Sequence, residues 1–77
     1  MQVTVYSTPT CPFCHQLKTF LDEQQIAYTN FDVSSDTHMA QEMIQKSGQM
    51  GVPVIDIDDE IVVGFDKDKL SELLKLA

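Results

Sequence analysis

A chain of 77 residues can form one domain around one small hydrophobic core, and we predict that a single domain spans residues 1–77. Its net charge of −7, from 12 acidic and 5 basic residues, opposes binding to nucleic acids and to anionic lipid surfaces. No basic leader opens the chain, and no apolar run approaches the ~20 residues of a membrane span. We therefore expect a cytoplasmic protein with no nucleic-acid or membrane partner. A monomer is the expected state, although the sequence does not decide it.

The first half of the chain predicts the order strand, helix, strand, helix. Residues 3–6 form a β-rich run that ends at turn-forming residues, and a helix is expected over about 12–25. Residues 26–33 form a second run of β type. The Ser-Ser-Asp segment 34–36 can cap a second helix, which Gly48 is suited to end. The apolar side of that helix is Met39, Ala40, Met43 and Ile44.

The second half predicts a hairpin and a last helix. Residues 52–57 alternate as a strand, the two aspartates 58–59 supply a turn, and residues 60–63 form the antiparallel partner. Asp66 can cap a helix with leucines at 70, 73 and 74 on one side. The predicted order is thus β-α-β-α-β-β-α, which is an α/β fold.

The chain has two cysteines, Cys11 and Cys14, three positions apart. A disulfide that closes so short a loop connects no distant parts of the fold, so stability must come from the 43% of apolar residues. In a cytoplasmic protein, disulfides are usually transient and catalytic. The pair is therefore a candidate for redox chemistry.

The start of the first predicted helix explains why Cys11 should be the reactive cysteine. If Pro12 is the first helical residue, Cys11 is the N-cap, and its sulfur faces the unpaired N–H groups of Phe13 and Cys14. Thiols in such positions have pKa values of about 3.5–7.5 rather than about 8.5, because the N–H groups and the helix dipole favour the thiolate. Cys14 lies one turn further on, within reach of a disulfide. We predict that Cys11 attacks a substrate disulfide and that Cys14 resolves the mixed disulfide.

Three other interpretations of the cysteines are open. They can be an inert buried pair, since free cysteines are often buried. They can bind zinc with His15 and His38, although no second paired cluster exists. The Cys-x-x-Cys-His pattern also fits covalent haem, with His15 and a methionine as axial ligands. Three β-rich runs and the proline between the cysteines weigh against haem, and we expect no bound metal or cofactor.

The sequence resembles the glutaredoxin family in three segments, which occur in family order over most of the chain. They are Tyr-Ser-x-Pro-Thr-Cys-Pro-Phe-Cys at 6–14, where x is any residue, Gly-Val-Pro-Val at 51–54 and Gly-Phe-Asp at 64–66. The resemblance implies a thioredoxin-like fold with a four-stranded mixed sheet, three helices and helices on both faces of the sheet. It also implies a cis peptide bond between Val52 and Pro53, opposite the cysteines.

The resemblance further implies a substrate-binding surface. The backbone of Val52, next to Pro53, is expected to pair with an extended peptide or with glutathione. Thr10 and Phe13 lie beside the cysteines in the matched motif, and Phe13 is expected to offer an apolar surface to substrate. The last substrate-facing loop of the family corresponds to Gly64, Phe65 and Asp66, although Asp66 is equally well explained as a helix cap.

Departures from the family pattern leave the electron donor open. Glutathione-using members often have a lysine where this chain has Thr8, and two glycines where it has only Gly64. The Gly-Phe loop and short chain are similar to glutaredoxin-like redoxins of the NrdH and YruB types, some of which are reduced by thioredoxin reductase. The expected function is reduction of protein disulfides or glutathione mixed disulfides. A redox-inert binding module is the alternative, and so is an iron–sulfur carrier, which Pro12 disfavours by family analogy.

Overall fold

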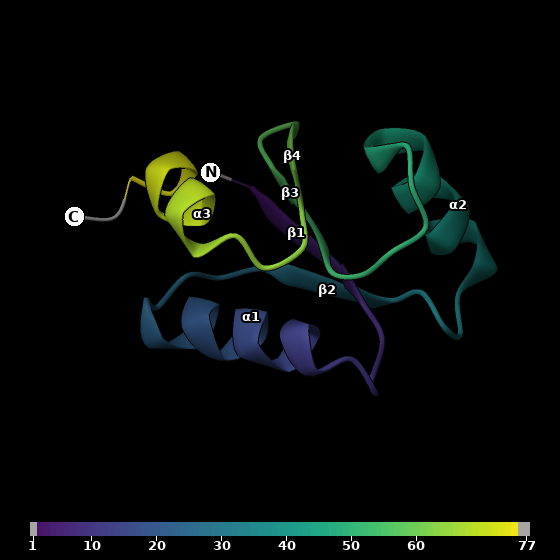
Figure 1. Ribbon diagram of the computed structural model, residues 1–77, viewed down its shortest axis with the longest axis horizontal. Helices are drawn as coiled ribbons and strands as arrows, with labels where there is room; N and C mark the ends of the chain where they lie inside the picture. Colours follow the sequence, from purple (N-terminus) through teal and green to yellow (C-terminus); the bar gives the residue numbers. More distant parts are fainter. Residues whose placement is uncertain (1, 76–77) are drawn as a thin grey trace.

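The computed structural model describes residues 2–75 as a four-stranded sheet flanked by three helices (Figure 1). The elements occur in the order that the sequence predicts. Their bounds are β1 Val3–Ser7, α1 Pro12–Glu23, β2 Thr29–Asp32, α2 Thr37–Ser47, β3 Val54–Ile57, β4 Glu60–Val63 and α3 Lys67–Leu73.

The sheet has the strand order β2-β1-β3-β4, with β1 parallel to β2 and all other pairs antiparallel. It is therefore mixed, as the family resemblance implies. Figure 1 shows α1 and α2 on opposite sides of the sheet. Since β1 lies in the middle, the loop that follows it opens at the centre of one edge, and this loop leads into α1.

The larger part of the core lies between the sheet and the helices α1 and α3. Alternate residues of the strands point to this face, and the apolar side of α1 completes it. Its buried members are Val3, Val5, Leu17, Phe20, Leu21, Ile55, Ile57, Val62, Leu70 and Leu74. Leu17 and Leu21 are fully buried, and burial of each contributes about 1.5–3 kcal/mol. These two residues fix α1 to the sheet and thereby fix the position of its first turn.

The α2 face combines a smaller apolar cluster with a polar network. Tyr6, Met43 and Val54 are buried there. Lys46 Nζ donates to Tyr6 Oη at 3.1 Å and to Asp56 Oδ2 at 2.8 Å. The hydrogen bond that Lys46 donates to Asp56, followed by the one to Tyr6, raises the pKa of Lys46 above its usual range. The lysine therefore compensates a carboxylate that is only 7% exposed.

The end of α1 differs from the prediction, and this shortens the second strand. The helix ends at Glu23 because Gln25 adopts a left-handed φ of 58°, and the Ile26 N–H then bonds to the Leu21 carbonyl at 2.9 Å. This is the pattern of a Schellman cap, in which an apolar residue after the helix packs back on it. The prediction of a strand from residue 26 was therefore wrong, and β2 covers only Thr29–Asp32.

The third strand is also shorter than predicted. The peptide bond between Val52 and Pro53 is cis, as the resemblance implies, and β3 starts after it at Val54 rather than at residue 52. The predicted turn between β3 and β4 is confirmed. Asp58 and Asp59 have φ values of 49° and 73°, which is typical of a type I′ hairpin turn.

Candidate active site

The first turn of α1 places a sulfur atom at the helix cap. Cys11 has extended backbone angles of φ −87° and ψ 116°, and Pro12 begins the helix, so the predicted cap position is confirmed. The Cys14 N–H donates to Cys11 Sγ at 3.3 Å. An N–H group in this place stabilises negative charge on the sulfur, as it does on the oxygen of an ordinary cap residue.

The residue opposite this sulfur is Val52. Cys11 Sγ lies 3.9 Å from the Val52 carbonyl oxygen, 41 positions later in the sequence. The prediction that the cis bond lies opposite the cysteines is therefore confirmed. Among the hydrogen bonds of residues 2–75, none uses the Val52 N–H. Because Cys11 is partly exposed, a bound molecule could reach its sulfur and the Val52 backbone together.

Cys14 has a different environment from Cys11. It is fully buried, and burial, followed by a hydrogen bond with the Cys11 sulfur, raises the pKa of Cys14 to about 11. A backbone contact with Thr8 and the charge of Lys18 act in the opposite direction with smaller effect. Cys14 is thus a protonated thiol at neutral pH, held beside a partly exposed sulfur that receives an N–H bond.

The His15 side chain contacts the loop before the cysteines. Its ring Nε2 lies 2.9 Å from the Pro9 carbonyl oxygen, in the loop that precedes Cys11. In residues 2–75 the structure brings together no group of three or more His, Cys, Asp or Glu side chains that could hold a metal ion. His38 lies on α2, which packs on the opposite face of the sheet from α1. The two histidines therefore do not form a four-ligand zinc site with the cysteines.

The loop after β4 is attached to the cis-proline segment. Gly64 has a left-handed φ of 80°, and its N–H donates to the Pro53 carbonyl at 2.8 Å. Asp66 Oδ1 accepts from the Lys69 N–H at 3.1 Å, so its role as the cap of α3 is confirmed. The loop therefore lies next to the site, but the Gly64 N–H and one oxygen of Asp66 already have partners within the protein.

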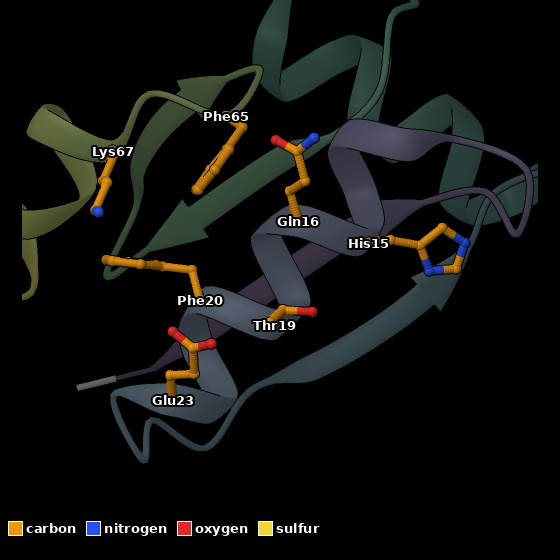
Figure 2. Close-up of a pocket in the computed structure, with 7 residues that line it drawn as sticks. All are labelled: His15, Gln16, Thr19, Phe20, Glu23, Phe65 and Lys67. Carbon is orange, nitrogen blue, oxygen red and sulfur yellow. The ribbon is translucent and has the colours of Figure 1, made fainter.

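Phe65, the remaining residue of the predicted loop 64–66, packs inward on α1. Its ring centroid lies 5.9 Å from that of Phe20 in a tilted arrangement, and Lys67 Nζ lies 5.8 Å from the Phe20 ring centroid. Beside them is a hollow of about 380 Å³ between α1 and the loop (Figure 2). Its lining is His15, Gln16, Thr19, Phe20, Glu23, Phe65 and Lys67.

Sequence reasoning did not find the hollow, because it forms only when the loop after β4 lies on α1. Gln16 and Thr19 carry no motif that would mark them as lining residues. Figure 2 shows the His15 ring projecting from the start of α1, away from Phe20 and Phe65.

Large apolar side chains are exposed near Cys11 and Val52 in the sequence. Phe13 is 59% exposed and Met50 is 78% exposed, and Thr10 is also exposed. Met50 projects from a short loop in which the Gln49 side chain accepts from the Gly51 N–H at 2.6 Å and donates to the Gly51 carbonyl at 2.9 Å. Exposed apolar groups beside a reactive atom favour contact with a partner. Phe13 is thus exposed, and its contact with substrate stays a prediction.

Within residues 2–75 no helix combines the length and the apolar character that crossing a membrane requires.

Comparison with known proteins identifies the family. The glutaredoxin family model matches residues 3–62. A glutaredoxin-like 8.6 kDa protein of the rubredoxin operon in Clostridium pasteurianum is 41% identical over 73 residues, which are 95% of this chain and 97% of that protein. The glutaredoxin-like protein NrdH of Lactococcus lactis subsp. cremoris is 36% identical over 75 residues, 97% of this chain and 99% of NrdH. A crystal structure of a mutant of the thioredoxin-like protein BC3987 matches with a TM-score of 0.94 at 34% identity, over 99% of this chain and 97% of that one. The chain therefore belongs to the glutaredoxin family, and it has the thioredoxin-like fold.

Proposed function

We propose that this protein is a dithiol oxidoreductase that reduces disulfides of other proteins. One observation carries the proposal: the partly exposed sulfur of Cys11 receives the Cys14 N–H at the start of α1, while the Cys14 thiol is buried beside it. An accessible sulfur whose negative charge is stabilised is suited to attack. A protected thiol within reach is suited to the second step.

The reaction proceeds in two exchanges. The Cys11 thiolate attacks a substrate disulfide, forms a mixed disulfide and releases one substrate thiolate. Cys14 then loses its proton to solvent and attacks Cys11 Sγ, which forms the Cys11–Cys14 disulfide and releases the second substrate thiolate. The substrate gains two electrons and the protein loses two. An outside reductant returns the protein to its dithiol form.

The surroundings of the sulfur favour a polypeptide as the substrate. The free Val52 N–H and its carbonyl can pair with an extended chain, as in strand addition. Phe13 and Met50 offer apolar contact area near that position in the sequence. Thr10 and the loop 64–66 are the remaining residues that we assign to substrate contact. The protein is proposed to work in the cytoplasm without a bound cofactor.

Two electron donors fit the family, namely glutathione as a co-substrate and thioredoxin reductase. In the loop where glutathione-using relatives receive the γ-glutamyl group, the Gly64 N–H is bonded to Pro53. The similarity to NrdH over nearly the whole chain supports the reductase. These observations favour thioredoxin reductase as the donor.

The test follows reduction of insulin disulfides with NADPH consumption as the readout. The assay has two arms: in the first, thioredoxin reductase is the electron donor, and in the second, glutathione with glutathione reductase is the donor. We expect consumption in the first arm and a rate about 10³-fold lower for Cys11→Ser, since serine keeps the helix cap but not the nucleophile. Cys14→Ser should still form a mixed disulfide but should not turn over.

Three outcomes would overturn parts of this proposal. Consumption only in the glutathione arm would assign the donor to glutathione. An unchanged rate in Cys11→Ser would remove the mechanism. Absence of exchange by the wild-type protein in both arms would favour a redox-inert binding module on the same fold.

A further inference from the structure

The loop between β1 and α1 has few hydrogen bonds of its own, although it carries the reactive sulfur. It comprises residues 8–11, and two of the five residues 8–12 are prolines, which have no N–H to donate. The hydrogen bond within the loop, from the Cys11 N–H to the Thr8 carbonyl, is long at 3.4 Å. Because the loop has few internal hydrogen bonds, a hydrogen bond from outside the loop can restrain it further.

His15 supplies that contact from the first turns of α1. Its backbone N–H donates to the Cys11 carbonyl at 3.2 Å, as any residue in that helical position would. Its side chain adds a specific bond, with 2.9 Å between ring Nε2 and the Pro9 carbonyl oxygen. A carbonyl oxygen only accepts, so the hydrogen must lie on Nε2. The ring is exposed and projects away from Phe20 and Phe65, so packing in the core does not hold it in place (Figure 2).

The loop that His15 holds touches both sulfurs. Cys11 is its last residue, and the Thr8 backbone at its other end contacts Cys14. Pro9 lies directly after Thr8, so a bond at the Pro9 carbonyl restrains the segment between the two contacts. Without that bond, the loop can move relative to the first turn of α1, and the two sulfurs lose their mutual alignment.

We infer that His15 is a positioning residue, whose ring holds the loop 8–11 on α1 and thereby aligns Cys11 and Cys14 for exchange. The inference rests on the proposed dithiol function and assigns to it a residue outside the cysteine motif. The hydrogen bond, and not the charge of the imidazole, is the active feature. An uncharged side chain that places a donor at the position of Nε2 should therefore replace histidine.

The test compares two amide side chains of different reach. Gln places its Nε2 donor near the position of the histidine Nε2, whereas Asn carries the same amide one methylene shorter and cannot span the distance to Pro9. The reduced protein is mixed with 5,5′-dithiobis(2-nitrobenzoate). The attack of Cys11 releases one coloured 2-nitro-5-thiobenzoate, and resolution by Cys14 releases a second from the same mixed disulfide. The two phases report the two steps separately.

We expect His15→Asn to slow the second phase about three- to tenfold, which is the effect of losing one hydrogen bond. The first phase should slow less, because it needs only one of the two sulfurs. His15→Gln should recover the wild-type rate of the second phase to within about twofold. Thermal unfolding should show no matching difference, since the His15 side chain is exposed.

Two results would overturn the inference. One is an equal second-phase rate in His15→Asn and the wild type. The other is equal slowing in Asn and Gln variants, which would assign the effect to the imidazole itself. A wild-type protein that releases no thiobenzoate would instead overturn the proposed function. Cys11→Ser, which should release none, serves as the control for the first phase.

Discussion

The starts of α1 and α2 have similar backbone geometry but different chemistry. At α1 the cap is Cys11, whose sulfur accepts from the N–H three residues later at 3.3 Å. At α2 the cap is Asp36, whose Oδ1 accepts from the N–H of Met39 at 3.1 Å. Both cap residues have extended backbone angles. The backbone carbonyl of each cap residue accepts a hydrogen bond from the N–H group four residues later. The helix start alone therefore does not make a redox site.

Two features distinguish α1 from α2. The atom at its cap is a sulfur, which can exchange bonds, whereas the carboxylate of Asp36 only accepts them. The cap of α1 also faces Val52 and has a buried thiol three residues later, where α2 has Met39. The reactive site thus depends on the cap atom, the cis-proline segment opposite and the resolving thiol together.

Of the changes that compare the two helix starts, moving the cysteine pair to α2 has the largest expected effect. A chain with Cys11→Ser, Cys14→Ser, Asp36→Cys and Met39→Cys has the same spacing and the same helix position. We expect it to reduce insulin disulfides at least about 100-fold more slowly than the wild type, because no Val52 backbone aligns a substrate there. The measurement is NADPH consumption with an excess of thioredoxin reductase.

A control shows that the transplanted pair is intact. The variant should form its new disulfide on oxidation, which mass spectrometry detects as a loss of two hydrogens. Wild-type activity in this variant would mean that a Cys-x-x-Cys motif at any helix start suffices for disulfide reduction. That result would contradict the claim that the cis-proline segment opposite α1 is required.

Local signals predicted the helix starts well, and contacts between distant segments were not predictable in the same way. Asp36, Asp66 and Cys11 are caps in the structure because each has a short acceptor side chain directly before a helix. Gly48, predicted to end α2, adopts a left-handed φ of 72°. These features depend on neighbouring residues only, and they follow from residue type.

Other features depend on the tertiary fold. Ile26 is a residue type that favours strands, but in the structure its N–H caps the C-terminal end of α1. The contact between Cys11 and Val52 and the bond from Gly64 to Pro53 join segments that the sequence shows only as separate motifs. The family resemblance, and not residue spacing, predicted the cis bond. The His15 bond to Pro9 had no sequence signal at all.

A smaller effect is expected at the α2 cap. Asp36→Ala removes the acceptor for the Met39 N–H and should lower the free energy of unfolding by about 1 kcal/mol. Asp36→Asn keeps an acceptor oxygen and should lose much less. Urea unfolding measures both, and thiol exchange should stay at the wild-type rate in each. A loss of exchange in Asp36→Ala would show that the two helix starts are coupled.

The central claim is that the two sulfurs of one motif have different roles, Cys11 attacking and Cys14 resolving. Brief treatment of the reduced, folded protein with iodoacetamide, followed by mass spectrometry of the peptides, tests it most directly. We predict that Cys11 is alkylated before Cys14 at neutral pH, because Cys14 is buried and its pKa is raised to about 11, which keeps it protonated. Alkylation of Cys14 at neutral pH, before or together with Cys11, would contradict the account.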